Sequence, residues 1–178
     1  MHSPRVLGLA GWSGAGKTTL LTRLIPLLVE RGLRVATLKH AHHEFDVDTP
    51  GKDSYEHRRA GASEVIVASS RRWVQMHELS GDEEPTLACL LRRVSPCDLV
   101  LVEGYKRERH PKLEVYRAVV GKPPLHPADP RIVAVATDSL LPGAHPPCVD
   151  MNDIPAVAEA ILAHALPIEQ VLEILEAA

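Results

Sequence analysis

Short apolar runs alternate with longer amphipathic segments along most of the chain. Four runs are rich in aliphatic side chains: Arg5–Ala10, Arg34–Lys39, Asp98–Val102 and Arg131–Ala136. Continuous apolar runs of this length, without polar alternation, are typical of parallel strands that are buried on both faces. The pattern therefore predicts an α/β fold, with a mostly parallel sheet and helices on both of its faces.

Helical spacing of apolar residues marks the segments between these runs. We predict helices over about 16–31, 53–60 and 84–94, a fourth helix capped by Asn152, and a last one that begins near Pro167. In the later helices the apolar side chains recur every three or four residues, as expected for a helix that packs one face against a sheet.

Residues 63–78 depart from this alternation of strands and helices. Ser63–Ser69 and Arg72–Glu78 flank a short turn and predict a β-hairpin added to the main fold. Leu113–Val120 also resembles a strand, and Gly121–Pro130, which contains four prolines, is predicted to be a loop. The apolar residues of the hairpin, Trp73 among them, need a cover, supplied either by the same domain or by a second copy of the chain.

Composition narrows the classes of protein to which the chain can belong. Its 178 residues suit a single domain over 1–178 that buries a core without disulfides. The formal net charge of -3 gives no basic field that would recruit nucleic acid or a membrane surface. The three cysteines form no CxxC pair, and no apolar run approaches the length of a membrane span, so we expect a cytoplasmic protein.

The residues that follow the first apolar run form a phosphate-binding motif. Gly11–Thr18 reads GWSGAGKT, which matches G-x-x-x-x-G-K-[ST] and opens the first predicted helix. Its glycines allow successive backbone N–H groups to converge on an anion that faces the positive end of the helix. Lys17 is then expected to reach the β- and γ-phosphates, and the Thr18 hydroxyl to bind Mg²⁺. The motif predicts a P-loop nucleotide-binding fold whose phosphate site consists of Gly11, Ser13, Gly14, Ala15, Gly16, Lys17, Thr18 and Thr19.

A P-loop protein also needs an acidic residue near its Mg²⁺, usually at the end of an apolar strand. The third apolar run ends in Glu103–Gly104, whereas Asp98 begins it. Because ligands gather at the carboxyl ends of parallel strands, we expect Glu103 rather than Asp98 to act on the metal. Thr18 and Asp48 are the other two candidate ligands of the metal.

Polar residues are dense in the segment that leaves the second apolar run. Lys39 and His40 are candidates for contact with an anion, and Asp46 or Asp48 for completing the Mg²⁺ shell or positioning a water. Together with Lys17 and Glu103, the two aspartates make up the candidate catalytic set. A transition-metal site built from His40, His42 and His43 is the alternative, although in an extended segment His43 faces away from the other two.

Two further segments carry candidate ligands for a nucleotide. Asp138 follows the last apolar run, where guanine-specific P-loop proteins place an aspartate that accepts hydrogen bonds from the base. The Asn/Thr-Lys-x that precedes such an aspartate is missing here. After Tyr105, the basic residues Lys106, Arg107 and Arg109 form either an anion-contacting loop or a solvated charged run.

Four segments resemble the molybdopterin-guanine dinucleotide biosynthesis adapter family: GWSGAGKTTLLTRLIPLL, LKHAHHEFDVDTPGKDSYEHRRAGA, VIVASSRRW and LVEGYK. The second and fourth segments are more specific than the P-loop, and the resemblance spans nearly the whole chain. It implies a homodimeric, weakly hydrolysing protein that binds GTP and Mg²⁺. Its partners would be molybdopterin and the molybdenum cofactor guanylyltransferase that joins GMP to it. Lys39, His40, Asp46, Asp48 and Asp53 would belong to the block of the family in the second segment.

Other classes of P-loop protein remain open at this stage. A metallochaperone GTPase that delivers a transition metal shares a His-rich region and a strand ending in Glu, and small-molecule kinases share the P-loop. A scaffold that binds nucleotide without turnover is a third reading. No arginine can be assigned to the γ-phosphate from the sequence, so the chain is expected to be at most a slow GTPase.

Overall fold

A computed structural model of the chain describes residues 3–41, 45–139, 141, 143 and 145–177. The chain forms two compact units. The first, here called the core unit, comprises residues 1–40 and 87–178, and the second, the hairpin unit, comprises 41–86. The single domain over 1–178 that the sequence suggests stays a prediction.

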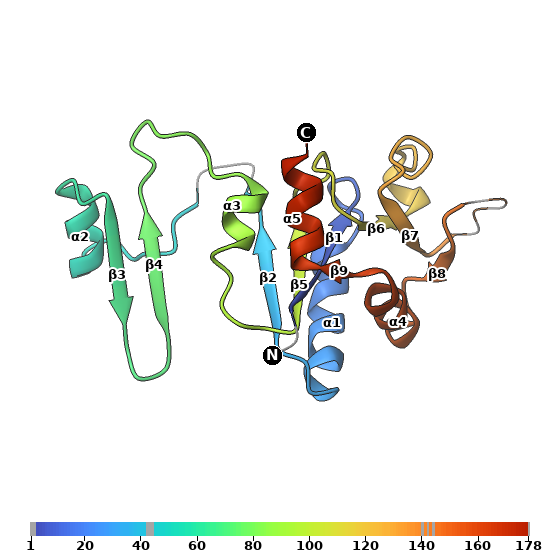
Figure 1. Ribbon diagram of the computed structural model, residues 1–178, viewed down its shortest axis with the longest axis horizontal. Coiled ribbons are helices and arrows are strands. Elements are labelled where there is room, and N and C mark those ends of the chain that lie inside the picture. The colour runs from blue at the N-terminus through green and yellow to red at the C-terminus, as the bar shows by residue number, and fades with distance from the viewer. Residues whose placement is uncertain (1–2, 42–44, 140, 142, 144, 178) are drawn as a thin grey trace. The chain divides into compact units, whose positions relative to one another are not determined.

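The core unit is built on a sheet whose main strands are all parallel (Figure 1). The strand order is β2 (Val35–Lys39), β5 (Leu99–Glu103), β1 (Arg5–Ala10), β6 (Lys112–Tyr116), β7 (Ile132–Thr137) and β8 (Cys148–Asp150). The short β9 (Leu166–Pro167) pairs antiparallel with β1. The P-loop class and the mostly parallel α/β sheet expected from the sequence are confirmed.

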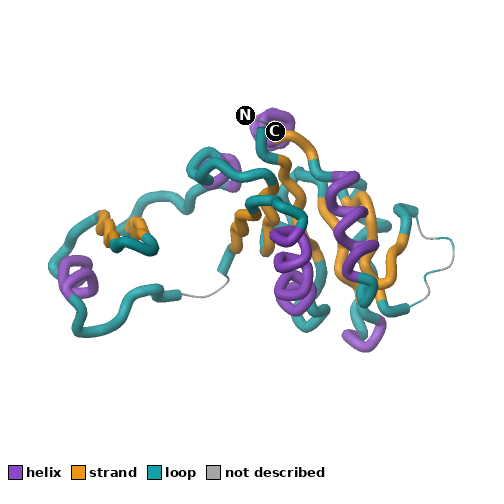
Figure 2. The backbone as a smooth tube through the Cα atoms, turned by 90° about the horizontal axis from the view of Figure 1, so that it is seen from below, coloured by secondary structure: helices purple, strands orange, loops and turns teal. Residues whose placement is uncertain are grey.

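Helices cover both faces of this sheet because the buried strands alternate apolar side chains between two cores. Leu7 and Leu9 of β1 lie in the core formed with α1 (Lys17–Glu30) and α4 (Ile154–His164). Val6 lies in the core formed with α3 (Leu87–Leu91) and α5 (Ile168–Glu176). Figure 2 shows α5 on the opposite side of the strands from α1. A 3₁₀ turn spans Ala118–Val120.

Two helix ends differ from the sequence-based expectation. α3 is shorter than the predicted 84–94, because the chain tightens after it into bonds to the third preceding residue, such as Arg93 N to Leu90 O (3.0 Å). The N-cap of α4 is Asp153, whose carboxylate accepts from Ala156 N at 3.0 Å. Asn152, the predicted cap, instead donates its side-chain amide to Asp150.

β6 is a central strand of the sheet, with polar side chains on one of its faces. Lys112 and Glu114 are almost fully buried there. Lys112 Nζ lies 3.0 Å from Asp129 Oδ2, and the Glu114 carboxylate accepts from the backbone N–H groups of Leu125 (2.6 Å) and His126 (2.9 Å). These contacts fasten the loop that follows β6 onto the sheet.

His110 fills the space above β1 on that same face. A Cβ built on Gly8 would lie 2.2 Å from His110 Nε2, so this position of the strand accepts only glycine. Burial lowers the pKa of His110 to about 3, helped by the nearby charge of Lys112. The imidazole is therefore neutral at physiological pH and serves as packing.

The hairpin unit contains α2 (Asp53–Arg59) beside an antiparallel pair of strands, β3 (Glu64–Ala68) and β4 (Trp73–His77) (Figure 1). The predicted hairpin and the second predicted helix are both confirmed. The register pairs Val65 with Met76 and Ala68 with Trp73.

Ionic contacts hold the hairpin unit together more than apolar burial does. The Arg58 guanidinium lies 2.8 Å from both Asp46 and Glu78 and 3.6 Å from Asp48. Within the unit, Val65 and Met76 are buried hydrophobic residues, but 61% of Ile66 and 63% of Trp73 are exposed. An isolated two-stranded hairpin is marginally stable at best in water, so this unit requires further cover.

None of the helices within the described part of the chain has the length and apolar character of a membrane span.

Candidate functional site: a phosphate loop beside an acidic strand end

The phosphate loop connects β1 to α1 at the carboxyl edge of the core sheet. Gly16 is the N-cap of α1, has φ 95°, and no side chain caps the helix. At Gly11, φ is 144°, and a Cβ would lie 2.5 Å from Val115 O of β6. The loop therefore runs closely against the neighbouring strand. Because no side chain caps this 14-residue helix, its first backbone N–H groups are available to bind an anion.

Lys17 spans this loop. Its Nζ donates to the carbonyl oxygens of Gly11 (2.8 Å) and Trp12 (3.1 Å). Burial lowers the pKa of Lys17, and the charges of Lys106 and Lys39 act in the same direction, while Glu103 opposes them. Lys17 thus lies among like charges, which an anion bound at the loop would neutralise.

Glu103 ends β5, the strand that pairs with β1, and is buried. Its Oε1 lies 3.4 Å from Thr18 Oγ1, and its Oε2 lies 3.8 Å from Lys39 Nζ. Two oxygen ligands in adjacent positions around an octahedral Mg²⁺ lie about 3 Å apart, since each metal–oxygen bond is about 2.1 Å. Thr18 and Glu103 therefore suit the ion that the sequence predicts between them.

The turn after Glu103 is set by a close backbone contact. Gly104 has φ 98°, and a Cβ there would lie 2.8 Å from His40 Cβ and from His40 O. His40 in turn packs its ring edge-on against Tyr105, with centroids 5.2 Å apart. The structure thus brings Lys39 and His40 to the acidic strand end, and their contact with an anion stays a prediction.

Asp46 and Asp48 belong to the hairpin unit, where both bind Arg58. The hydrogen bond from Arg58 holds the pKa of Asp46 below its usual value. Asp48 Oδ1 also accepts from Ser54 Oγ at 2.9 Å. A role for either aspartate at the phosphate loop stays a prediction.

The transition-metal alternative depends partly on His42 and His43, which lie outside the described residues. Among the residues that are described, no group of three or more His, Cys, Asp or Glu side chains is arranged to hold a metal ion.

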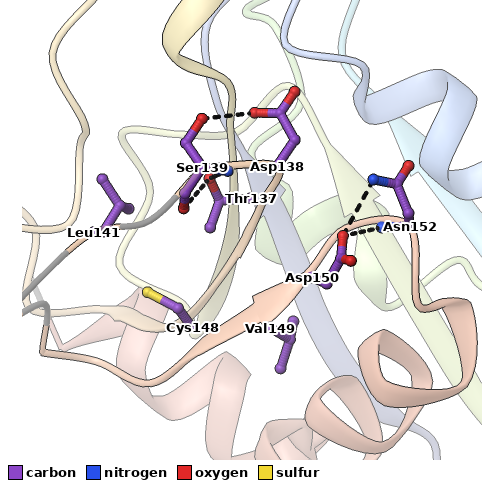
Figure 3. A pocket seen from close by; sticks show the side chains of 8 residues that line it. All are labelled: Thr137, Asp138, Ser139, Leu141, Cys148, Val149, Asp150 and Asn152. Carbon is purple, nitrogen blue, oxygen red and sulfur yellow. Dashed lines mark hydrogen bonds between the residues drawn. The ribbon is translucent and has the colours of Figure 1, made fainter.

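A pocket of about 630 Å³ lies at the carboxyl ends of β7 and β8 (Figure 3). Asp138, the predicted reader of the base, is on its wall. The Asp138 carboxylate accepts from Arg117 Nε (2.8 Å) and from Ser139 Oγ (2.9 Å), and these two hydrogen bonds lower its pKa. The lining residues are Thr137, Asp138, Ser139, Leu141, Cys148, Val149, Asp150 and Asn152.

Sequence reasoning missed three side chains around these sites. Arg117 follows β6 and pairs with Asp138. Trp12 lies inside the phosphate motif, at a position that the motif leaves unspecified. Lys106, which the sequence placed in either an anion-contacting loop or a solvated charged run without any link to Trp12, lies with its Nζ 4.6 Å from the centroid of the Trp12 ring. The sequence feature that could have pointed to Lys106 as part of the site is its position three residues after Glu103.

Comparison with known proteins places these features in a family. The sequence profile of the family described as molybdopterin guanine dinucleotide synthesis protein B matches residues 6–138. The molybdopterin-guanine dinucleotide biosynthesis adapter protein of Escherichia coli (strain K12) is 45% identical over 160 residues, which cover 88% of this chain and 91% of that protein. The adapter protein of Haemophilus influenzae is 42% identical over 158 residues, covering 88% and 86% of the two chains.

Solved structures agree with the sequence comparison. A crystal structure described as molybdopterin-guanine biosynthesis protein B superposes with a TM-score of 0.68 at 29% sequence identity. The superposition covers 89% of this chain and 98% of that one. The phosphate loop, the acidic strand end and the added hairpin are thus found in a chain that belongs to the molybdopterin guanine dinucleotide synthesis protein B family.

Proposed function

We propose that this protein is a GTP-binding adapter in molybdopterin-guanine dinucleotide biosynthesis. In this role it assists the guanylyltransferase that joins GMP to molybdopterin. The observation that carries the proposal is the juxtaposition of Lys17 and Thr18 with Glu103 at one sheet edge, in a chain 45% identical to an adapter protein of that biosynthesis.

Different residues around the phosphate loop bind the phosphates of the nucleotide and its Mg²⁺. Lys17 exchanges its bonds to Gly11 O and Trp12 O for phosphate oxygens, and the first amides of α1 bind the same phosphates. Thr18 and Glu103 hold Mg²⁺, which neutralises charge on the β- and γ-phosphates. Lys39, whose Nζ lies 3.8 Å from Glu103 Oε2, holds that carboxylate in place.

The basic groups of the site point to slow turnover. Rapid GTP hydrolysis needs a cation that stabilises the transition state, commonly an arginine supplied by the chain or by a partner. The cations described at the loop are Lys17, Lys39 and Lys106, and Arg117 is bound to Asp138. A long-lived GTP complex suits an adapter, since it gives the partner time to bind.

Guanine is proposed for the pocket beside β7 and β8, with Asp138 as its reader. The pocket volume lies in the range usual for small-molecule sites. A carboxylate accepts from both the ring N–H and the exocyclic amine of guanine, whereas adenine lacks that pair of donors. The base would displace Ser139 Oγ, while Arg117 would hold the carboxylate in orientation.

A homodimer joined through the hairpin is also proposed. Ile66, Val67, Trp73 and Val74 are each at least 40% exposed. They lie at the turn end of the two paired strands, where Val67 pairs with Val74. A two-fold axis would allow each copy to cover the hairpin of the other, the commonest closed arrangement for a self-complementary surface.

Replacing Asp138 by Asn tests the reading of the base. We expect unlabelled GTP to displace labelled GTP from the wild type at least about tenfold more effectively than ATP, because ATP leaves the carboxylate unmatched. The Asp138→Asn variant should lose most of this difference. Equal potency of ATP and GTP on the wild type would refute guanine selectivity, and retained selectivity in the variant would exclude Asp138 as the reader.

Replacing Trp73 by Glu tests the dimer. The wild type should sediment as a dimer at micromolar concentration, and the variant as a monomer, since the substitution places an unpaired charge in an apolar contact. Ser95→Glu, which adds the same charge at an exposed position of the core unit, is the control and should remain dimeric. A monomeric wild type would end the proposal.

Binding to the guanylyltransferase tests the adapter function. We expect the purified protein to bind the transferase more tightly with GTP and Mg²⁺ than without them, as measured by calorimetric titration. Lys17→Ala should remove the effect of GTP because it deletes a charge-assisted contact with the phosphates. Arg93→Ala removes an exposed cation just beyond α3 and should behave as the wild type. Absence of any binding between the wild type and the transferase would contradict the proposed function.

A further inference from the structure

Trp12, the second residue of the phosphate motif, is held by a loop distant in sequence. Its indole Nε1–H donates to Pro123 O at 2.8 Å. The segment that carries Pro123 is itself fastened to the sheet by Glu114, which accepts from the next backbone N–H groups along it, those of Leu125 and His126. The Trp12 ring is therefore fixed beside the loop by a buried carboxylate on β6.

Lys106 lies over the face of this fixed ring. Its Nζ is 4.6 Å from the ring centroid, well within the distance of a cation–π contact, while Lys122 is at the outer limit with 6.0 Å. Lys106 follows Glu103 by three residues, so it is on the segment that leaves the acidic strand end. Two independently positioned elements thus place one ammonium group at the phosphate loop.

Among the described residues whose charges act on Lys17, positive charge exceeds negative charge. Lys17, Lys39 and Lys106 all act on the loop, and Glu103 is the carboxylate that opposes them. Like charges at short distance repel, and the repulsion is relieved when a polyanion binds among them. A cation–π contact outside a desolvated site is weak, so Lys106 can leave the ring for an anion at small cost.

We propose that Lys106 is a further phosphate-binding residue, and that Trp12 holds its ammonium group beside the loop until the terminal phosphates of GTP arrive. The inference rests on the proposed function, since it concerns the same nucleotide site. Lys106 then adds a charge-assisted contact that strengthens the binding of the terminal phosphates. Release of Lys106 from the ring also makes Trp12 a built-in reporter of phosphate binding.

Affinity for two nucleotides separates this role from a structural one. With Mg²⁺ present, Lys106→Met should weaken the binding of GTP by about tenfold, as expected for a lost charge-assisted hydrogen bond. Binding of GMP, which lacks the terminal phosphates, should change by less than about twofold. The matched control Arg107→Met removes the same charge from the next, exposed residue and should leave both affinities unchanged. An equal loss for both nucleotides, or no loss for GTP, would overturn the assignment.

Tryptophan fluorescence tests the release from Trp12. The chain contains two tryptophans, so a Trp73→Phe background isolates the emission of Trp12. GTP should change this emission, and Lys106→Met should abolish most of the change at saturating GTP. An equal change with and without Lys106 would contradict the release. If the wild type bound no GTP, the proposed function would fail together with this inference, whereas normal binding by Lys106→Met would remove only the role of Lys106.

Discussion

The parallel pairing of β1 with β5 is the constraint on which the site depends. Its register sets Leu9 opposite Glu103, and the pairing of β2 with β5 sets Lys39 opposite the same residue. Three strands thus end together, so the phosphate loop, the acidic group and a lysine emerge at one edge. A shift of β5 by one residue would turn Glu103 to the other face of the sheet, away from Thr18.

The second half of the sheet supports the loop from the opposite side. β6 buries Lys112 and Glu114 on one face, where a helix-covered sheet would have aliphatic residues. Both charges are paired, Lys112 with Asp129 and Glu114 with two backbone N–H groups, as buried charges must be. These contacts use charge to order a proline-rich loop, and that loop positions Trp12. The buried polar groups of β6 therefore serve to position Trp12 at the phosphate site rather than to stabilise the core.

Local signals predicted one half of this arrangement well and the other half poorly. Purely apolar strands such as β1, and the glycine motif, could be predicted from the sequence because their residues suit only one structural environment. The central position of β6 in the sheet could not be predicted. The alternation of Lys112, Leu113 and Glu114 is typical of a strand that is exposed on one face. The contact of Trp12 with Pro123 joins residues 111 positions apart, and no local pattern encodes it. Likewise, Asp153 caps α4 in place of Asn152 because the side-chain amide of Asn152 donates to Asp150 instead.

The central claim is that Thr18 and Glu103 hold Mg²⁺ with GTP at this sheet edge, and titration of GTP with and without Mg²⁺ tests it most directly. The account predicts that Mg²⁺ strengthens GTP binding by the wild type, and that Thr18→Val, which removes one oxygen ligand, loses this dependence. GTP affinity of the wild type that is the same with and without Mg²⁺ would contradict the account.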